Sequence, residues 1–275
     1  MTGEFSVLRD GLFAERTALV TGAGRGMGKS IALRFAALGA NVVATGRHME
    51  TLSETAGEIE AFGAACLAHP CDIRDVEQVD SLVKAAAERF GTIDFLINNA
   101  GGQFPARPSA ISDRGWRAVV DLNLNGTWNM LSRVGPLMTA QEFGAVVNIV
   151  HVYSFDRGAP SFVHSGAARA GVVSLTRTLA MYWARHNVTI NALAPGSIAT
   201  EGLREKEYAQ MDVADYETVQ IRDVPAHRLG ERDEMAEICA FLCSPAARYI
   251  NGSVITADGA QSLGNWSDTW DMEIP

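Results

Sequence analysis

Short runs of apolar, β-branched residues alternate along the chain with longer stretches in which apolar and polar residues mix at helical spacing. Between the first two runs, Ile31, Phe35 and Leu38 lie on one helical face and Gly39 supplies a stop. The runs predict strands at 17–21, 41–45, 94–98, 145–150, 188–194 and 253–259. This alternation predicts an α/β fold, doubly wound, in which helices cover both faces of a parallel sheet.

No linker rich in proline, glycine or serine and no internal repeat interrupts this rhythm, so we expect one domain over residues 1–275. Residues 197–228 are the exception, because they are too long for an ordinary connection. Long segments at strand ends are often functional, and we interpret this one as a substrate lid, with a simple surface excursion as the alternative. Residues 263–275 are expected to form an irregular tail.

Composition excludes several classes of function. A net charge of −9 without a basic run argues against a nucleic-acid partner. No apolar stretch approaches a membrane span, and the first residues do not resemble a secretory signal, so we expect a cytoplasmic protein. The 4 cysteines lack CxxC spacing and the 6 histidines form no HxxxH pair, which predicts reduced thiols and no metal site.

The stretch LVTGAGRGMGKS places Gly22, Gly26, Met27 and Gly28 between a predicted strand and a predicted helix. Glycine tolerates positive φ and lets the main chain approach a pyrophosphate, while the helix N-terminus offers unpaired N–H groups. The loop therefore predicts a phosphate cradle, with a glycine-rich connecting turn as the alternative.

The second predicted strand ends in ATGRH, with Arg47 where NAD sites usually carry an acid for the ribose 2′-hydroxyl. A guanidinium fits a 2′-phosphate in a bidentate manner, and Arg25 in the glycine loop adds a second cation. We therefore predict NADP(H) rather than NAD(H), with two solvated surface arginines as the alternative.

Five motifs in order, TGAGRGMG, CDIRD, NNAGG, DLNLNGT and NALAPG, resemble those of the short-chain dehydrogenase/reductase family over residues 15–262. The resemblance implies a Rossmann-type, seven-stranded parallel sheet and a homotetramer built from long helices that begin near Gly115 and Ser165. It also implies that the cofactor contacts Asp72, Ile73, Asn99, Ala100, Gly101, Arg169, Pro195, Gly196, Ile198 and Thr200.

The family's usual catalytic residues are Asn, Ser, Tyr and Lys. Asn123 matches the first, whereas the tyrosine and lysine positions hold Ser165 and Arg169 and the serine position falls near His151. Peroxisomal-type trans-2-enoyl-CoA and 2,4-dienoyl-CoA reductases, which this chain resembles, also have serine in place of the tyrosine. The dienoyl enzymes place a tyrosine five residues after a strand asparagine, which corresponds to Tyr153.

Ser165 and Arg169 are four residues apart and share one helical face, while Tyr153 leaves the end of a strand, where ligands bind in open α/β sheets. Tyr153 and Ser165 can donate hydrogen bonds to a carbonyl oxygen that gains charge. Arg169 stays protonated and cannot act as a base, which favours reduction. The alternatives are that Tyr153 is an ordinary aromatic, that Ser165 is an N-cap, or that His151 or His164 donates the proton.

We therefore predict NADPH-dependent reduction of the C=C bond of a 2-enoyl thioester or a related conjugated carbonyl compound. The alternatives are an NADP-dependent alcohol or ketone oxidoreductase, for example on terpenoid alcohols, and a dinucleotide-binding protein without turnover. The expected partner is a small molecule, with acyl-CoA among the candidates. Arg107 and Arg114 are the candidate basic contacts for it, with solvated loop charges as the favoured alternative. The acidic residues of the predicted lid weigh against CoA phosphates.

Overall fold

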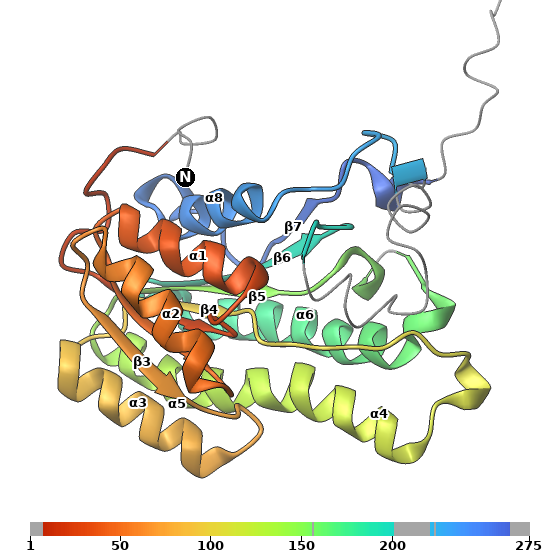
Figure 1. Cartoon of the computed structure of the whole chain (residues 1–275), viewed down its shortest axis with the longest axis horizontal. Coiled ribbons are helices and arrows are strands. Elements are labelled where there is room, and N and C mark those ends of the chain that lie inside the picture. The colour runs from red at the N-terminus through yellow and green to blue at the C-terminus, as the bar shows by residue number, and fades with distance from the viewer. Residues whose placement is uncertain (1–7, 156, 201–220, 223, 265–275) are drawn as a thin grey trace, which may run out of the picture.

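The computed structural model describes residues 8–155, 157–200, 221–222 and 224–264, and they form a doubly wound α/β fold around one parallel sheet (Figure 1). The sheet has 7 strands in the order β3-β2-β1-β4-β5-β6-β7. The strands are β1 (Thr17–Thr21), β2 (Asn41–Gly46), β3 (Cys66–Pro70), β4 (Phe95–Asn98), β5 (Gly144–Ile149), β6 (Val188–Pro195) and β7 (Val254–Ala257). The predicted fold class is confirmed.

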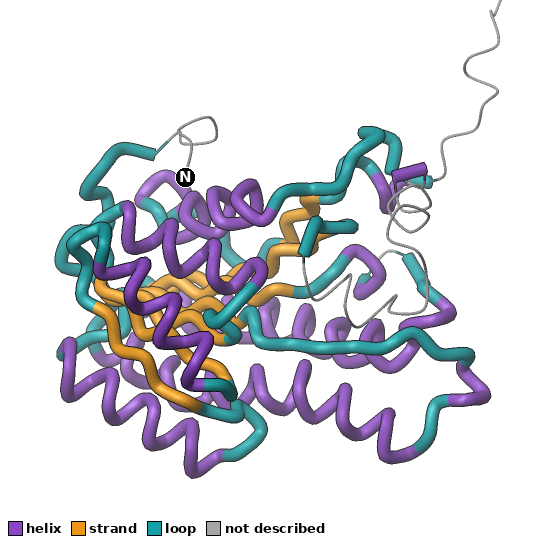
Figure 2. Tube along the Cα trace, in the orientation of Figure 1, coloured by secondary structure: helices purple, strands orange, loops and turns teal. Residues whose placement is uncertain are grey.

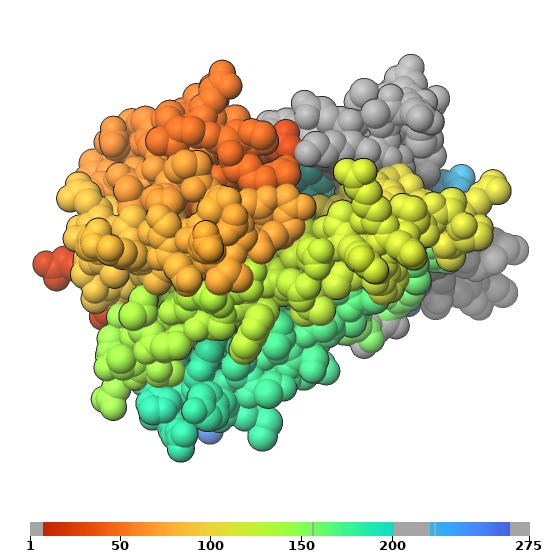
Figure 3. Space-filling view, turned by 90° about the horizontal axis from the view of Figure 1, so that it is seen from below, coloured from red at the N-terminus to blue at the C-terminus, as the bar shows by residue number. Residues whose placement is uncertain are grey.

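Helices cover both faces of the sheet, as Figure 2 shows. One face carries α1 (Gly26–Ala37), α2 (Met49–Glu60) and α8 (Arg232–Cys243). The other carries α3 (Val76–Phe90), α4 (Asp113–Val120), α5 (Gly126–Ala140) and α6 (Val163–Trp183). In the view from below, α3, α5 and α6 lie side by side (Figure 3).

Two apolar layers hold this arrangement together. On the first face, the rings of Phe13, Phe35 and Phe95 pack against one another, with Phe13 lying 5.1 Å from Phe35 and 4.7 Å from Phe95 between centroids. On the second face, Met130 and Trp183 are buried against the sheet. Burying the strands on both faces explains why they read as continuous apolar runs in the sequence.

The structure differs from the sequence expectations at two places. Strand β3 was not predicted, because CLAHP has no β-branched residue; it is a partly exposed edge strand, where Pro70 is tolerated. Ser165 is not an N-cap, because α6 begins at Val163. Of the predicted lid, residues 201–220 and 223 lie outside the described residues, as do residues 265–275 of the predicted tail.

The strand order places a site at the carboxyl ends of β1 and β4. The chain runs outward from β1 to β2 and β3, then returns to start the second half at β4, so the connections that follow these two strands diverge. Ligands of open α/β sheets bind in the crevice at such a switch point. Within the described residues, no helix is both long and apolar enough to cross a bilayer.

Candidate active site

A cleft of about 390 Å³ opens at the carboxyl ends of the strands. All of the cofactor residues expected from the sequence line it: Gly22, Arg25, Gly26, Met27, Gly28, Arg47, Asp72, Ile73, Asn99, Ala100, Gly101, Arg169, Pro195, Gly196, Ile198 and Thr200. Gln103, Leu122 and His151 line it too. The motifs spread over most of the chain therefore converge on one site.

The glycine loop leaves no room for a side chain at Gly28. A Cβ on Gly28 would lie 2.2 Å from the carbonyl oxygen of Gly22, and Gly22 itself has a φ of +69°. Helix α1 begins at Gly26, and its N-cap residue Arg25 makes no side-chain capping hydrogen bond. The first N–H groups of α1 can therefore face a phosphate instead of a side chain.

Thr21 fixes the floor beneath this loop. Its hydroxyl oxygen accepts hydrogen bonds from the main-chain N–H groups of Asn99 and Ala100, both at 2.9 Å. The Asn99 side chain donates back to the Thr21 carbonyl oxygen at 2.9 Å. These bonds join the ends of β1 and β4. They hold the glycine loop and the NNAGG segment at a constant separation.

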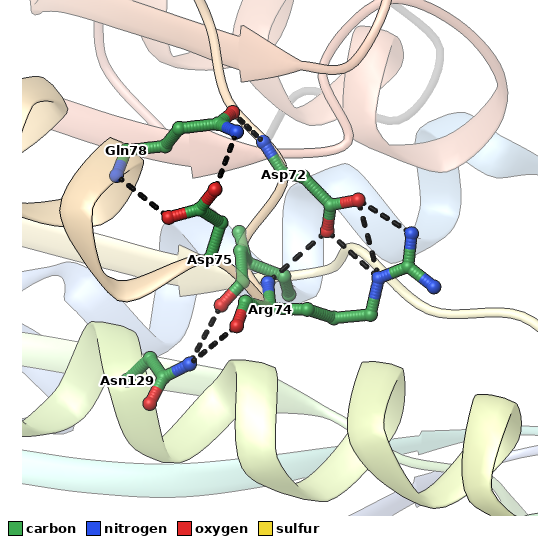
Figure 4. Close-up of polar contacts among 6 residues, drawn as sticks. Asp72, Arg74, Asp75, Gln78 and Asn129 are labelled. Atoms are coloured by element: carbon green, nitrogen blue, oxygen red, sulfur yellow. Dashed lines mark hydrogen bonds and ion pairs between the residues drawn. The ribbon is translucent and has the colours of Figure 1, made fainter.

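The wall after β3 is built from a network of polar side chains, shown in Figure 4. Arg74 donates to the Asp72 carboxylate, with Nε 2.9 Å from Oδ1, and this contact lowers the pKa of Asp72. The Gln78 side chain accepts from the Asp72 N–H at 2.9 Å, and Asn129 on α5 donates to the Ile73 carbonyl oxygen at 2.9 Å. The main chain of the wall is thus held from both sides.

Positive charge prevails along the cleft even though the chain carries a net charge of −9. Among the described lining residues, Arg25, Arg47 and Arg169 are cationic, whereas Asp72 is the one carboxylate and is already paired with Arg74. Arg47 follows β2 directly, and both Arg25 and Arg47 are exposed. This distribution suits an anionic ligand.

Helix α6 brings Ser165 and Arg169 to the inner end of the cleft, which we call the Arg169 end. Arg169 lines the cleft, and its Nη1 donates to the carbonyl oxygen of Ile149 at 2.7 Å. Ser165, one turn earlier, is fully buried. A Cβ on Gly101 would lie 2.6 Å from Arg169 Nη2, so the guanidinium lies directly against the loop after β4.

His151 connects Ser165 to the cleft. Its Nε2 lies 3.1 Å from Ser165 Oγ, and its Nδ1 accepts the main-chain N–H of Tyr153 at 3.2 Å. Burial, and then the positive charge of Arg169, lowers the pKa of His151 from 6.5 to about 3. Sequence reasoning treated His151 only as an alternative donor, although its place near the family's serine position was the available signal.

Tyr153 lies beside His151, with the ring centroids 5.6 Å apart. Its hydroxyl oxygen accepts a hydrogen bond from Gln261 Nε2 at 3.3 Å, and Tyr153 is not among the described residues that line the cleft. Gln261 is buried and also donates to Ser197 Oγ at 3.0 Å. No sequence pattern predicts this contact, because the two partners are 108 residues apart.

Asn123 lies in a short π-helix, Asp121–Asn125, between α4 and α5. Its buried Nδ2 donates to the carbonyl oxygens of Gly102 and Val119, both at 2.8 Å. Such π-turns are frequent at functional sites, and here the turn directs Asn123 at the loop after β4. His164 is buried against Phe104 and does not line the cleft, and Arg107 and Arg114 are exposed outside it.

Comparison with known proteins shows to which family this chain belongs. A family model described as enoyl-(acyl carrier protein) reductase matches residues 22–260. The chain belongs to the short-chain dehydrogenase/reductase family. It is similar to a probable 2,4-dienoyl-CoA reductase of Bacillus subtilis, with 39% identity over 90% of this chain and 97% of the relative.

Two further proteins are similar to this short-chain dehydrogenase/reductase. The probable 2,4-dienoyl-CoA reductase 3 of Caenorhabditis elegans is 34% identical over 97% of this chain and 89% of the relative. A solved structure of a citronellol catabolism dehydrogenase from Pseudomonas aeruginosa PAO1 is 39% identical to this chain, with a TM-score of 0.81. The match covers 94% of this chain and 99% of that chain. The resemblance read from the sequence motifs is confirmed.

The protein is therefore an oxidoreductase of this family, whose members use nicotinamide dinucleotides. The residues of the cleft fit such a group: the Gly22–Gly28 approach would be filled by a Cβ, and α1 presents uncapped N–H groups beside it. Within the part of the chain that the structure describes, no group of His, Cys, Asp and Glu is placed to hold a metal ion.

Proposed function

We propose that this oxidoreductase uses NADPH to reduce the C=C bond of a 2-enoyl thioester or a related conjugated carbonyl compound. One observation carries the proposal: among the described residues, the titratable groups that line the Arg169 end are a permanent cation, Arg169, and His151, whose pKa is about 3. Oxidation of an alcohol near pH 7 needs a base, and neither residue can serve as one. Reduction of an activated double bond needs hydrogen-bond donors and an acid instead.

Bound NADPH would supply the hydride that adds to the β-carbon of the substrate. The chain must then stabilise the negative charge on the carbonyl oxygen and deliver a proton to the α-carbon. We assign Ser165 and Tyr153 as hydroxyl donors, with Tyr153 as the proton source because a phenol is a stronger acid than an aliphatic alcohol. Arg169 adds a fixed positive charge.

Asn123 supports this site without changing protonation. It holds both the carbonyl and the N–H of Gly102, with Gly102 N 3.3 Å from Asn123 Oδ1. We assign it the role of keeping the loop after β4 in place beneath the cofactor. The remaining cleft-lining residues predicted from the sequence are assigned to cofactor binding.

The preference for NADPH over NADH rests on charge. Arg47 follows β2 at the position where an acid would hold a free 2′-hydroxyl, and Arg25 adds positive charge nearby. Because Arg74 neutralises Asp72, no unpaired carboxylate among the described lining residues opposes a 2′-phosphate. Two guanidiniums are well suited to a phosphate dianion.

The choice of a conjugated thioester is supported by the relatives named 2,4-dienoyl-CoA reductases. A second candidate, oxidation or reduction at an alcohol or ketone, is favoured by the 39% identity to the citronellol catabolism dehydrogenase. The two differ in where the hydride lands: on a β-carbon in the first, and on a carbonyl carbon in the second.

We also propose a homotetramer in the cytoplasm. Large apolar side chains are exposed on α5 and α6, namely Trp128 at 45%, Met181 at 86% and Tyr182 at 62%, which suits burial between subunits. All 4 cysteines are free thiols, as expected in a reducing compartment.

The test is NADPH oxidation by the purified protein with a panel of enoyl thioesters, dienoyl thioesters, ketones and alcohols, the last with NADP⁺. Turnover of conjugated thioesters supports the proposal, and turnover of ketones or alcohols alone supports the second candidate. Tight nucleotide binding without turnover of any compound would indicate a dinucleotide-binding protein.

A further inference from the structure

Gln261 connects two loops that follow neighbouring strands of the sheet. It comes after β7, begins a short 3₁₀ turn, Gln261–Leu263, and is 2% exposed. Its side-chain amide contacts Tyr153, which follows β5, and Ser197, which follows β6. Neither the sequence motifs nor the proposed function gives Gln261 a role, although it links the assigned proton source to a loop that lines the cleft.

The contacts of Gln261 define which end of its amide faces each partner. The main-chain N–H of Ser197 can only donate, and its nitrogen lies 2.9 Å from Oε1 of Gln261. Oε1 is therefore an acceptor that faces the loop after β6. Nε2 lies 3.0 Å from Ser197 Oγ and 3.3 Å from Tyr153 Oη, and its two hydrogens can serve one oxygen each. The phenol oxygen of Tyr153 thus accepts a hydrogen bond from Gln261.

The main chain around Gln261 holds the amide in this place. Arg157 Nη1 donates to the carbonyl oxygen of Gln261 at 2.6 Å, and the N–H of Gln261 donates to the carbonyl oxygen of Asp258 at 3.1 Å. Ala260 has a φ of +71°, a left-handed conformation that alanine rarely adopts. A Cβ on Gly196 would lie 2.6 Å from Oε1, so the amide lies directly against a residue that lines the cleft.

We propose that Gln261 is a positioning residue that prepares Tyr153 to give up its proton. This inference rests on the proposed function, in which Tyr153 is the proton source. An N–H that donates to a phenol oxygen stabilises the phenolate that remains after the proton has left. Because the same amide holds Ser197 and lies against Gly196, it also fixes the Tyr153 hydroxyl relative to the loop after β6.

The proton that completes the product comes from the Tyr153 hydroxyl. After the hydride has added to the β-carbon, the O–H bond of Tyr153 breaks, its hydrogen joins the α-carbon, and the electron pair stays on the phenol oxygen. The Nε2–H of Gln261 donates to this oxygen throughout, and its hydrogen bond is stronger to the anion than to the neutral phenol. Water returns a proton to the phenolate before the next turnover. Gln261 itself neither gains nor loses a proton.

Gln261→Glu is the most informative change, because the two side chains have the same shape. A carboxylate still accepts the main-chain N–H of Ser197, so the anchor to the loop after β6 remains. It has no hydrogen to donate to Tyr153, and it competes with the substrate for the phenol hydrogen. At pH 9, kcat with a substrate that the wild type reduces should fall by about 10- to 100-fold, and NADPH affinity should stay within about threefold.

The pH profile separates this role from a purely structural one. A protonated carboxyl group donates its O–H as the amide does, so kcat of Gln261→Glu should recover toward the wild-type value as the pH falls from 9 to 5. An amide does not titrate, so the ratio of the two kcat values reports the introduced group. Arg157, Asp258 and His151 are the charged or titratable groups beside Gln261 and Tyr153 among the described residues, and both proteins contain them. A ratio that does not change with pH would overturn the proposal.

A double variant tests whether Gln261 acts through Tyr153. In Tyr153→Phe the proton source is already absent, so adding Gln261→Glu should change kcat by less than about twofold. Gln261→Leu removes both the donor and the acceptor and should weaken NADPH binding as well, because the anchor of Ser197 is lost. Losses from Tyr153→Phe and Gln261→Glu that multiply in the double variant would overturn the proposal.

The last arm needs no substrate. ¹H–¹⁵N spectra resolve the two side-chain amide hydrogens of Gln261, which are assigned by their loss in Gln261→Glu. Tyr153→Phe should shift one of them upfield and Ser197→Ala the other, because each variant removes one acceptor. Unchanged signals in Tyr153→Phe would overturn the contact. If the wild type reduces nothing in the panel, the proposed function fails and the role of Gln261 in proton transfer fails with it. The spectra still judge the contact in that case, so the two failures are distinguishable.

Discussion

Arg169 donates a hydrogen bond from Nη1 to the main-chain carbonyl of Ile149 at 2.7 Å. This bond ties α6 to the end of β5, so the fold itself fixes the cation at the Arg169 end of the cleft. A guanidinium can hold a main-chain oxygen with one nitrogen and still present others to a ligand, which a lysine ammonium does less well. The position of the positive charge is therefore set before any ligand arrives.

Replacing Arg169 with methionine should raise the pKa of His151, because the positive charge of Arg169 contributes to its depression. The direction follows from removing a like charge that opposes the imidazolium. ¹H–¹⁵N spectra recorded from pH 3 to 8 measure the change. Arg177→Met, at an exposed position two turns further along α6, is the matched control and should not move it.

Arg47→Asp should weaken NADPH binding by about 10- to 100-fold, since a charge-assisted contact to the 2′-phosphate is replaced by repulsion. NADH, which lacks this phosphate, should bind about as well as before. Fluorescence titration of both cofactors measures the ratio, with Arg185→Asp as a control for the change in net charge. A variant that keeps its preference for NADPH would show that Arg47 does not read the phosphate.

Gly28→Ala should abolish dinucleotide binding, because its Cβ would lie 2.2 Å from the Gly22 carbonyl oxygen. The backbone shift needed to relieve this contact should also cost about 1–3 kcal/mol of unfolding free energy. Gly57→Ala is the control: it lies within α2 with nothing within 4 Å of the added carbon. It should stabilise the protein by about 0.5–1 kcal/mol and leave binding intact.

Stability should fall in mild acid on account of His151. Its pKa is about 3 in the folded protein against 6.5 for a free histidine, so between these values the unfolded chain binds a proton that the folded chain does not. Unfolding free energy then decreases as the pH falls below 6.5, by up to about 1.4 kcal/mol per pH unit for one such group.

Urea denaturation of the wild type and His151→Gln from pH 4.5 to 8 measures this effect. The variant should lose stability less steeply below pH 6.5, while the two curves should run parallel between pH 7 and 8. Parallel curves over the whole range would contradict the low pKa.

The sequence was most informative where motif spacing reflects main-chain geometry. The glycine loop follows directly after a predicted strand, so its place in the order of elements predicted a phosphate cradle at Gly22, whereas Asn99 was assigned to the cofactor site through the family resemblance of NNAGG. Strand β3 was not predicted, because CLAHP lies at the exposed edge of the sheet and lacks β-branched residues.

The spacing of residues along the sequence could not predict the direction of the side chains. Whether His151 faces Ser165, and whether Tyr153 turns toward Gln261, depends on rotamers set by packing between distant segments. The π-turn at Asn123 likewise follows from tertiary contacts, since its residues read as part of one continuous helix. The sequence thus located the site but not the hydrogen-bond pattern within it.

The most direct test of the account follows the hydride itself. The protein is given NADPH deuterated at C4 on the transferred face, together with a 2-enoyl thioester, and the product is examined by NMR and mass spectrometry. The account predicts a saturated thioester with one deuterium on the β-carbon and a solvent-derived proton on the α-carbon. Deuterium on a carbinol carbon, with the double bond intact, would contradict it.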